Sequence, residues 1–189
     1  MANQVKPLAI LGSTGSIGIS TLDIIRRFPK DFRVVGLSTN ANIELLAGQI
    51  KEFHPQHVCV RQSAGAAELA TRLKGRVRVY AGREGLVELV SQKKADEVVV
   101  AISGSGALGA LVAAISNRKQ IVLANKESLV MAGPIVMRLA AEHKVVIKPV
   151  DSEQSAIWQC LNGQDARVLK HIYLTASGGP FRGKSCAQL

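Results

Sequence analysis

LAILGSTGSIG, residues 8–18, is the stretch that decides the fold, because a short apolar run leads directly into three glycines and a helical segment. We expect a strand over Leu8–Leu11 and a helix over Ile17–Phe28. In parallel α/β sheets the pyrophosphate of a dinucleotide binds at such a junction, against the N-terminus of the helix. The spacing GxxGxxG differs from the commoner GxGxxG, so the interpretation depends on the placement of the loop between strand and helix. The hydroxyls of Ser13, Thr14 and Ser16 are expected to donate hydrogen bonds to the ligand.

Apolar strands and helical segments alternate through the first 150 residues. Further strands are expected at 33–38, 57–60, 77–80, 97–102, 120–124 and 145–150, and further helices at 43–53, 64–73, 84–92, after Gly106 and up to His143. Asn42 is expected to cap the helix that ends at Phe53. Gly133-Pro134 is expected to divide the last helical stretch, because the residue before a proline avoids the helical region. This alternation predicts an α/β fold with a doubly wound parallel sheet, a Rossmann-like dinucleotide-binding domain over residues 1–150.

The pattern changes after Val150. A short helix is expected over Glu153–Leu161, a strand over Val168–Thr175, and a break in regular structure at residues 177–180, SGGP. Residues 151–189 are therefore interpreted as the beginning of a second, α+β domain. This segment is too short to bury a core of its own.

Composition narrows the classes of partner. Of the 189 residues 47% are hydrophobic, and the net charge is +10. The cations stand singly or in pairs without interleaved aromatic residues, so we expect no nucleic-acid partner and instead an attraction for small anionic ligands. The cysteines, Cys59, Cys160 and Cys186, give no disulfide framework, which favours a reducing cytoplasm. The N-terminus is too short and polar for a signal peptide, and no apolar run is long enough to span a membrane.

The end of the second predicted strand bears on the choice between NAD and NADP. An NAD site usually has a carboxylate there, which binds the ribose 2′-hydroxyl. Residues 37–42 read LSTNAN, and the first carboxylate is Glu44. Small polar side chains accept a 2′-phosphate without repelling it. NADP is therefore favoured, although this loop contains no arginine to bind the phosphate.

A second glycine motif, GSGALG at residues 104–109, fits GxGxxG to the letter. Because it follows a later strand, we expect it to let a loop pass close to the cofactor rather than to bind the pyrophosphate. A structural turn between strand and helix explains these glycines equally well.

Two polar clusters follow later strands. In NKES, residues 125–128, Lys126 stands between an amide and a carboxylate, which suits a phosphorylated or metal-bound substrate; a helix start capped by Asn125 is the alternative.

Asp151-Ser152-Glu153 follows the apolar run 145–150. If that run is a buried strand and the backbone stays extended, both carboxylates project from one side and offer two hard oxygen ligands to Mg²⁺ or Mn²⁺. The alternative is that they open a helix, where acidic residues are favoured.

Four motifs taken together closely resemble the 1-deoxy-D-xylulose 5-phosphate reductoisomerase family: GSTGSIG at 12–18, ANKES at 124–128, PVDSE at 149–153 and SGGPFR at 177–182. Their order and separation agree with that family across essentially the whole chain. The resemblance implies a step of non-mevalonate isoprenoid biosynthesis, in which NADPH and a divalent cation (Mg²⁺, Mn²⁺ or Co²⁺) serve the conversion of the ketose phosphate to 2-C-methyl-D-erythritol 4-phosphate. Rearrangement of the carbon skeleton is followed by hydride transfer. A phosphorylated ketose is thus the implied substrate, and a homodimer the implied full-length form.

The resemblance also implies roles for individual residues. Cofactor binding falls on Thr14, Gly15, Ser16 and Ile17, on Asn40, Ala41 and Asn42 near the 2′-phosphate, and on Asn125 and Glu127. Substrate contacts fall on Lys126, Ser152, Glu153 and Ser177, and metal ligation on Asp151 and Glu153, which makes Lys126, Asp151 and Glu153 the catalytic residues.

Members of this family continue well beyond position 189, with an active-site flap, a third acidic metal ligand and a C-terminal helical domain. We therefore expect this chain to be an amino-terminal portion with negligible turnover alone. Members often have glycine or lysine where Asn40 and Ala41 stand, and the loop after Gly104 departs from their usual sequence. Two alternatives stay open, namely another NADP-dependent dehydrogenase and a non-catalytic NADP-binding module.

Overall fold

The structure is a computed structural model that describes residues 5–174, 178–179 and 182–188. The chain divides into two compact units, Met1–Val150 and Asp151–Leu189.

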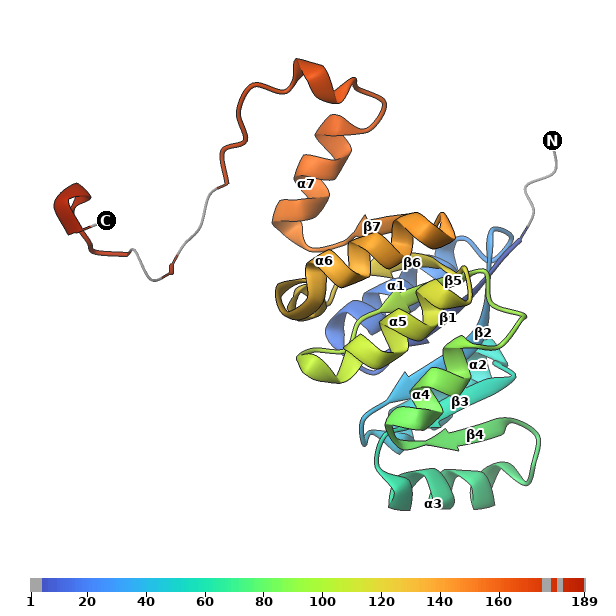
Figure 1. Ribbon diagram of the computed structural model, residues 1–189. Coiled ribbons are helices and arrows are strands. Elements are labelled where there is room, and N and C mark those ends of the chain that lie inside the picture. The colour runs from blue at the N-terminus through green and yellow to red at the C-terminus, as the bar shows by residue number, and fades with distance from the viewer. Residues whose placement is uncertain (1–4, 175–177, 180–181, 189) are drawn as a thin grey trace. The chain divides into compact units, whose positions relative to one another are not determined.

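The first unit is built on one seven-stranded parallel sheet with the order β4-β3-β2-β1-β5-β6-β7 (Figure 1). Its strands are β1 (Lys6–Leu11), β2 (Phe32–Thr39), β3 (His57–Val60), β4 (Arg78–Ala81), β5 (Glu97–Val100), β6 (Gln120–Leu123) and β7 (Ile147–Pro149). The strand order runs outward from β1 in both directions, first through β2 to β4 and then from β5 to β7. The predicted doubly wound α/β fold is confirmed.

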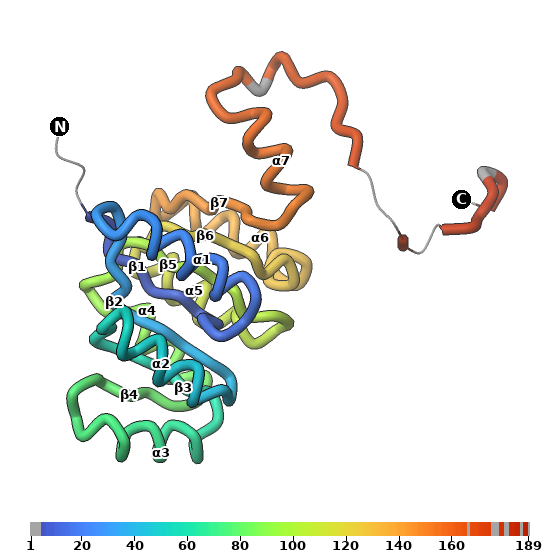
Figure 2. The backbone as a smooth tube through the Cα atoms, turned by 180° about the vertical axis from the view of Figure 1, so that it is seen from behind, coloured from blue at the N-terminus to red at the C-terminus, as the bar shows by residue number. Residues whose placement is uncertain are grey.

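Helices cover both faces of this sheet. They are α1 (Ser16–Arg27), α2 (Ile43–Phe53), α3 (Ser63–Leu73), α4 (Gly82–Val90), α5 (Leu108–Ser116) and α6 (Lys126–His143). In Figure 2, α1 and α2 lie on the near face, whereas α4 and α5 lie behind the sheet. Alternate residues of β1 supply the two cores: Leu8 and Ile10 pack with α1, α2 and α3, and Ala9 and Leu11 pack with α4, α5 and α6. Burial on both faces explains why the strands are continuous apolar runs.

Two predicted helix boundaries are confirmed. The Asn42 side chain accepts a hydrogen bond from the Leu45 N–H (3.1 Å) at the start of α2. Inside α6 the backbone leaves the helical region at Ala132 (φ −143°, ψ 27°), directly before Gly133-Pro134.

The predicted buried strand over residues 145–150 is shorter and more exposed than expected. Only Ile147–Pro149 form β7, and none of the three is fully buried. The reason is its place at the edge of the sheet, where β6 is its one strand neighbour. Val146 and Val150, on either side of β7, are both exposed.

The second unit contains α7 (Ser152–Leu161) and two short 3-10 helices, Ala166–Val168 and Cys186–Gln188. The predicted strand over Val168–Thr175 is wrong for the residues described: Val168 ends a 3-10 helix, residues 169–174 have no regular structure, and Thr175 lies outside the described residues. A strand needs a hydrogen-bonded neighbour, and the described part of this unit contains no other strand to pair with. None of its described side chains is buried.

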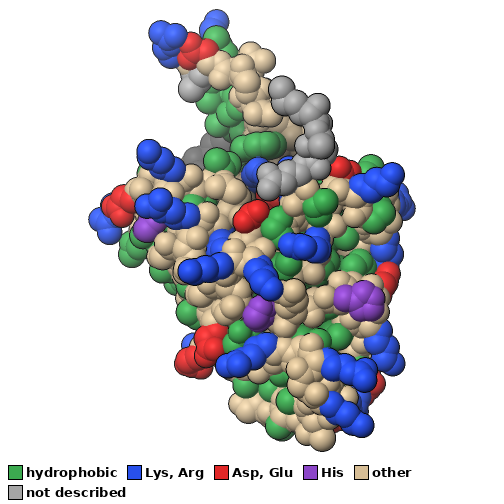
Figure 3. All heavy atoms as spheres, turned by 90° about the vertical axis from the view of Figure 1, so that its right-hand side faces the viewer, with side chains coloured by type: hydrophobic (Ala, Val, Ile, Leu, Met, Phe, Trp, Pro, Cys, Tyr) green, Lys and Arg blue, Asp and Glu red, His purple; other side chains and the backbone are tan. Residues whose placement is uncertain are grey.

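On one face of the molecule the cations are dispersed (Figure 3). Figure 3 shows one face of the molecule, on which Lys and Arg side chains are separated by acidic, apolar and polar groups. Among the helices in residues 5–174 and 182–188, none combines the length and apolar character needed to cross a membrane.

Candidate functional site

The glycine loop joins β1 to α1 under tight steric limits. Gly12 has φ +85°, and a Cβ there would lie 2.7 Å from the Ala101 carbonyl oxygen beyond β5. A Cβ on Gly18 would lie 2.3 Å from the Gly12 carbonyl oxygen, so the first turn of α1 packs directly on the loop. Gly15 is the N-cap of α1 and is exposed. Gly12 and Gly18 therefore shape the loop, while Gly15 presents backbone at the start of the helix.

Ser13 anchors this loop from inside. Its side chain is fully buried, and its hydroxyl donates to Oε1 of Gln49 on α2 (2.7 Å), while Gln49 Nε2 donates to the Ser13 carbonyl (2.9 Å). The Ser13 N–H donates to the Ser38 carbonyl of β2 (2.8 Å). The expectation that Ser13 donates to a ligand is thus wrong, because its hydrogen-bonding groups are used within the fold. Thr14 and Ser16 lie closer to solvent, and the Thr14 hydroxyl pairs with that of Thr39 (2.7 Å).

Two neighbouring hollows lie along the carboxyl edge of the sheet at this loop. One, of about 340 Å³, is lined by Gly12, Thr14, Gly15, Thr39, Asn40, Arg61, Leu86, Ala101, Ile102 and Ser103. The other, of about 330 Å³, is lined by Gly15, Ser16, Ile17, Ala101, Ile102, Ser103, Ala124, Lys126 and Glu127. They share Gly15 and residues 101–103, and together we call them the edge groove. The groove lies where β1 separates β2 from β5, the topological switch point at which open α/β sheets bind ligands.

The structure brings together many of the residues predicted for cofactor binding. Thr14, Gly15, Ser16, Ile17, Asn40 and Glu127 line the edge groove, as does Lys126, which was predicted to contact substrate. Ala41 and Asn42 follow Asn40 in the loop that leads into α2, and both are exposed.

Asn125 occupies a buried position beside the groove. Its Oδ1 accepts from the Ser128 N–H (2.9 Å), which caps α6, and its Nδ2 donates to the carbonyls of Ile102 (2.7 Å) and Gly104 (2.9 Å). Nδ2 also lies 3.0 Å from Glu127 Oε2. Since the amide makes these internal bonds, Asn125 joins the loop after β5 to the start of α6.

Glu127 fixes the same loop from the groove side. Its Oε1 accepts from the Gly104 N–H (3.1 Å). Hydrogen bonds from its own backbone N–H and from that of Gly104 lower the pKa of this carboxyl, so it is anionic at neutral pH. Gly104 has a positive φ of +74°, a conformation that favours glycine. The three glycines of this motif, Gly104, Gly106 and Gly109, are not among the residues that line the groove. Ile102 and Ser103, just before this motif, do line it, while the role predicted for the motif itself stays a prediction.

Asp151 and Glu153 lie on either side of a helix start. Asp151 is the N-cap of α7 with extended backbone (φ −76°, ψ 158°), and Glu153 is in the first helical turn. The condition that the backbone stays extended through both residues is therefore not met. The pairing of this segment with β6 ends here because β6 stops at Leu123. The Val150 N–H donates the last hydrogen bond between the two segments, to the Leu123 carbonyl (3.0 Å). The alternative, in which acidic residues open the helix, is the observed one, but the Asp151 side chain makes no capping hydrogen bond.

The remaining predicted site residues can be placed only in part. Ser152 is exposed at the first position of α7, and Ser177 lies outside the described residues. No group of three or more His, Cys, Asp or Glu side chains suited to a metal ion occurs in the described part of the chain. The assignment of Asp151 and Glu153 as metal ligands stays a prediction.

Arg61 was missed by sequence reasoning. It follows β3 directly and lines the first hollow together with Thr39 and Asn40. The loop after β2, where a cation for the phosphate was expected, contains no arginine. The available signal was the position of Arg61 at the end of the next strand in the sheet, at the same edge.

A larger hollow, of about 690 Å³, lies at the opposite, amino edge of the sheet. Its lining includes Lys51, His54, Arg72, Lys74 and Arg76, near the C-terminal ends of α2 and α3. Cations are favoured at helix C-termini, because the last carbonyls carry partial negative charge. Arg72 is also paired with Glu44 and Glu68. This helix-end role explains the basic character without a ligand, and the hollow lies away from the glycine loop.

Sequence comparison identifies the family. The profile described as 1-deoxy-D-xylulose 5-phosphate reductoisomerase matches residues 8–133, and the profile of the C-terminal domain of that enzyme matches residues 147–189. The chain belongs to the 1-deoxy-D-xylulose 5-phosphate reductoisomerase family. The reductoisomerase of Thermoanaerobacter pseudethanolicus is 50% identical over 180 residues, which are 95% of this chain and 47% of that protein. The chain spans about half the length of the curated relatives it matches.

Solved reductoisomerase structures agree with this assignment. The Zymomonas mobilis enzyme in complex with NADPH superposes with a TM-score of 0.87 at 39% identity, covering 97% of this chain and 49% of that one. A reductoisomerase in complex with NADPH, fosmidomycin and magnesium superposes with a TM-score of 0.81 at 41% identity, covering 87% of this chain and 40% of that one.

Proposed function

We propose that this chain is the NADPH-binding and metal-contributing part of a 1-deoxy-D-xylulose 5-phosphate reductoisomerase. The reaction is the NADPH- and metal-dependent rearrangement and reduction of 1-deoxy-D-xylulose 5-phosphate to 2-C-methyl-D-erythritol 4-phosphate, in non-mevalonate isoprenoid biosynthesis. The observation that carries the proposal is the edge groove at the switch point of the sheet, which is lined by residues of the glycine loop and of the NKES cluster, both within the matched range 8–133.

The edge groove fits a dinucleotide phosphate. The N-terminus of α1 opens at Ser16 beside the exposed backbone of Gly15, and free N–H groups at a helix N-terminus attract anions. The first hollow has no carboxylate among its described lining residues. We assign Thr14, Gly15, Ser16 and Ile17 to the pyrophosphate side, and Asn40, Ala41 and Asn42 to the ribose phosphate.

The other half of the groove suits the reacting end of the cofactor. Glu127 orders the loop after β5 through the Gly104 N–H, and Asn125 ties that loop to α6 (2.7 Å to Ile102 O). In this proposal Asn125 holds the loop after β5 in place, and its side chain, which is bonded within the fold, does not itself bind the cofactor. Bound NADPH would supply the hydride, while this loop would hold the nicotinamide and exclude water from one side of it.

Asp151 and Glu153 are proposed as metal ligands, since their carboxylate oxygens suit Mg²⁺ or Mn²⁺. A bound divalent cation would stabilise negative charge on the substrate oxygens. Lys126, exposed at the first position of α6, would bind substrate phosphate or oxygen, together with Ser152, Glu153 and Ser177. Two carboxylates leave an octahedral ion short of protein ligands, so we expect NADPH binding by these 189 residues but negligible turnover.

The metal role can be tested by titrating Mn²⁺ into the chain by calorimetry. Asp151→Asn should weaken binding about tenfold or more, because the affinity for hard cations depends on the charge of the ligand set. Asp165→Asn removes an exposed carboxylate that pairs with Arg167 (2.5 Å) and should leave binding unchanged. Equal effects of both variants would contradict the assignment.

The activity is tested by following NADPH oxidation with 1-deoxy-D-xylulose 5-phosphate and Mn²⁺, for this chain and for a form extended to the length of its relatives. Turnover by the extended form alone is expected. Turnover by neither form would contradict the proposed activity and favour another dehydrogenase or a non-catalytic NADP-binding module.

We further propose that the extended form is a homodimer, which analytical ultracentrifugation can test. We also propose the cytoplasm as its compartment.

A further inference from the structure

Among the described residues that line the first hollow of the edge groove, Arg61 is the one that carries a charge. It follows β3 and is half-buried. Its guanidinium reaches toward the turn after β5, since a Cβ built on Gly106 would lie 3.2 Å from Arg61 Nη1. The guanidinium therefore lies near the turn after β5 rather than extending fully into solvent.

This guanidinium has no carboxylate partner among the described residues. Arg26 and Arg72, by contrast, are paired: Arg26 with Asp23 and Glu52, and Arg72 with Glu44 and Glu68. A half-buried cation without a counter-charge loses solvation without a compensating attraction. An anionic ligand would supply that attraction.

The backbone places Arg61 beside the loop after β2. Its N–H donates to the Thr39 carbonyl (3.0 Å), and the next N–H, of Gln62, donates to the Asn40 carbonyl (3.2 Å). The end of β2 is where dinucleotide folds of this kind meet the adenosine ribose and its 2′ position. Glu44, the nearest carboxylate in the sequence after that loop, pairs with Arg72 on α3.

We propose that Arg61 binds the 2′-phosphate of NADPH and makes the site prefer NADPH to NADH; the proposal rests on the proposed function, since it assumes that the edge groove holds the dinucleotide. A guanidinium offers a planar fork of donors that matches phosphate oxygens. NADH carries a hydroxyl at this position and gains nothing from the fork. The small side chains of Thr39 and Asn40 leave room for the phosphate beside it.

The test is the affinity of the purified chain for NADPH and for NADH, measured by calorimetry on the wild type, Arg61→Gln and Arg61→Lys. Arg61→Gln should weaken NADPH binding about 10- to 100-fold, as expected when a charge-assisted hydrogen bond is lost. NADH binding should change less than about twofold, because that ligand lacks the phosphate. Arg61→Lys should retain part of the preference, since it keeps the charge but loses the fork.

A matched control removes a neighbouring cation. Arg83 lines a separate hollow with Gly106 and does not line the edge groove. Arg83→Gln should leave both affinities within about twofold, because screening weakens the effect of exposed charges at a distance. A loss equal to that of Arg61→Gln would mean a general effect of net charge and would overturn the proposal.

Two smaller probes separate the phosphate from the adenine. Arg61→Gln should weaken 2′,5′-ADP but not 5′-ADP. Equal losses for both probes, or for NADPH and NADH, would mean that Arg61 stacks on the base or supports the loop, and would overturn the proposal. If the wild type binds neither dinucleotide, the proposed function itself fails, a result that no Arg61 variant can produce.

Discussion

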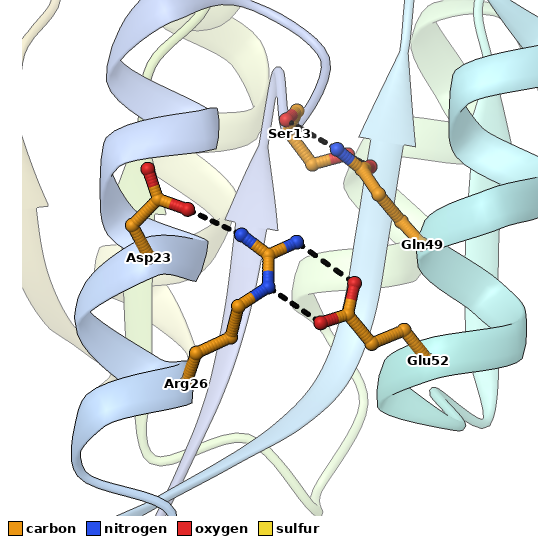
Figure 4. Close-up of polar contacts among 5 residues, drawn as sticks. All are labelled: Ser13, Asp23, Arg26, Gln49 and Glu52. Carbon is orange, nitrogen blue, oxygen red and sulfur yellow. Dashed lines mark hydrogen bonds and ion pairs between the residues drawn. The ribbon is translucent and has the colours of Figure 1, made fainter.

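The Gln49 side chain on α2 and Ser13 in the glycine loop exchange two hydrogen bonds across 36 positions of the sequence (Figure 4). Gln49 Nε2 donates to the Ser13 carbonyl (2.9 Å), and the Ser13 hydroxyl donates to Gln49 Oε1 (2.7 Å). Both side chains are buried. The glycine loop is thus fixed by a helix that follows the next strand.

Replacing Gln49 should destabilise the fold and loosen the loop. Gln49→Leu preserves most of the volume but leaves the buried Ser13 carbonyl without this donor, which costs about 1–3 kcal/mol. Urea unfolding should show this loss in the free energy of unfolding. Gln92→Leu, which removes a peripheral bond to the Glu88 carbonyl (2.9 Å), should cost less than about 0.5 kcal/mol. Equal losses would contradict the anchoring role of Gln49.

Gly18 should not tolerate a side chain. A Cβ would lie 2.3 Å from the Gly12 carbonyl oxygen and 2.5 Å from Ser13 Cα, both parts of the backbone. Gly18→Ala should therefore cost about 1–3 kcal/mol or more and should abolish NADPH binding. The control is Gly48→Ala in the middle of α2, where a Cβ would meet nothing within 4 Å. It should gain about 0.5–1 kcal/mol of stability, because alanine is the better helix former. A neutral Gly18→Ala would show that the packing of α1 on the loop is not tight.

The pair formed by Arg26 and Glu52 should give the stability a pH dependence. Arg26 on α1 donates two hydrogen bonds to the carboxylate of Glu52 on α2 (Nη2 to Oε2, 2.8 Å; Figure 4). This hydrogen-bonded guanidinium lowers the pKa of Glu52 from its ordinary value of 4.5. A carboxyl with a lowered pKa stabilises the fold fully above its unfolded pKa and loses that contribution as pH falls through its folded pKa. Because both side chains are more than 40% exposed, the contribution should be at most about 1 kcal/mol.

Glu52→Gln should accordingly be less stable than the wild type at pH 7, and the difference should disappear in acid, as measured by urea unfolding across pH. Glu142→Gln, which removes a long exposed pair with Arg138 (3.8 Å), is the control and should show almost no difference at either pH. A Glu52→Gln difference that persists in acid would exclude the ion pair as its source.

The cysteines should differ in reactivity. Cys59 is fully buried on β3, and burial raises the pKa of its thiol to about 12, whereas Cys160 is exposed. Alkylation at pH 8, followed by mass spectrometry of the peptides, should label Cys160 at least about 100-fold faster than Cys59. In urea the difference should vanish. Rapid labelling of Cys59 in the native chain would show that β3 is not buried as described.

Local signals made most of the first unit predictable. The Asn42 cap, the break before Gly133-Pro134 and the strand–glycine–helix junction each depend on residues near in sequence, and all three are observed. The errors depend on distant partners. Val168 looked like the start of a strand because its side chain is β-branched, but a strand also needs a neighbour. Ser13 looked like a ligand donor because a hydroxyl in a loop usually faces solvent, and only the position of Gln49 shows that it does not.

In the candidate site, too, the residues in local motifs could be predicted and those that depend on distant partners could not. Its members on the glycine loop and after β6 were found from motifs, since each motif begins where a strand ends. Arg61 belongs to no motif. Its place in the edge groove depends on the pairing of β3 with β2, which cannot be read from the residues around Arg61. Asn125 was predicted both as a helix cap and as a cofactor residue; the bonds of its side chain support the cap.

Hydrogen–deuterium exchange of this chain with and without NADPH tests the central claim most directly, since it measures both binding and its place. The account predicts slower exchange in residues 12–18, 39–42, 101–104 and 124–127, which border the edge groove. No change on adding NADPH, or protection confined to residues 50–56 and 72–77 around the basic hollow at the amino edge, would contradict it.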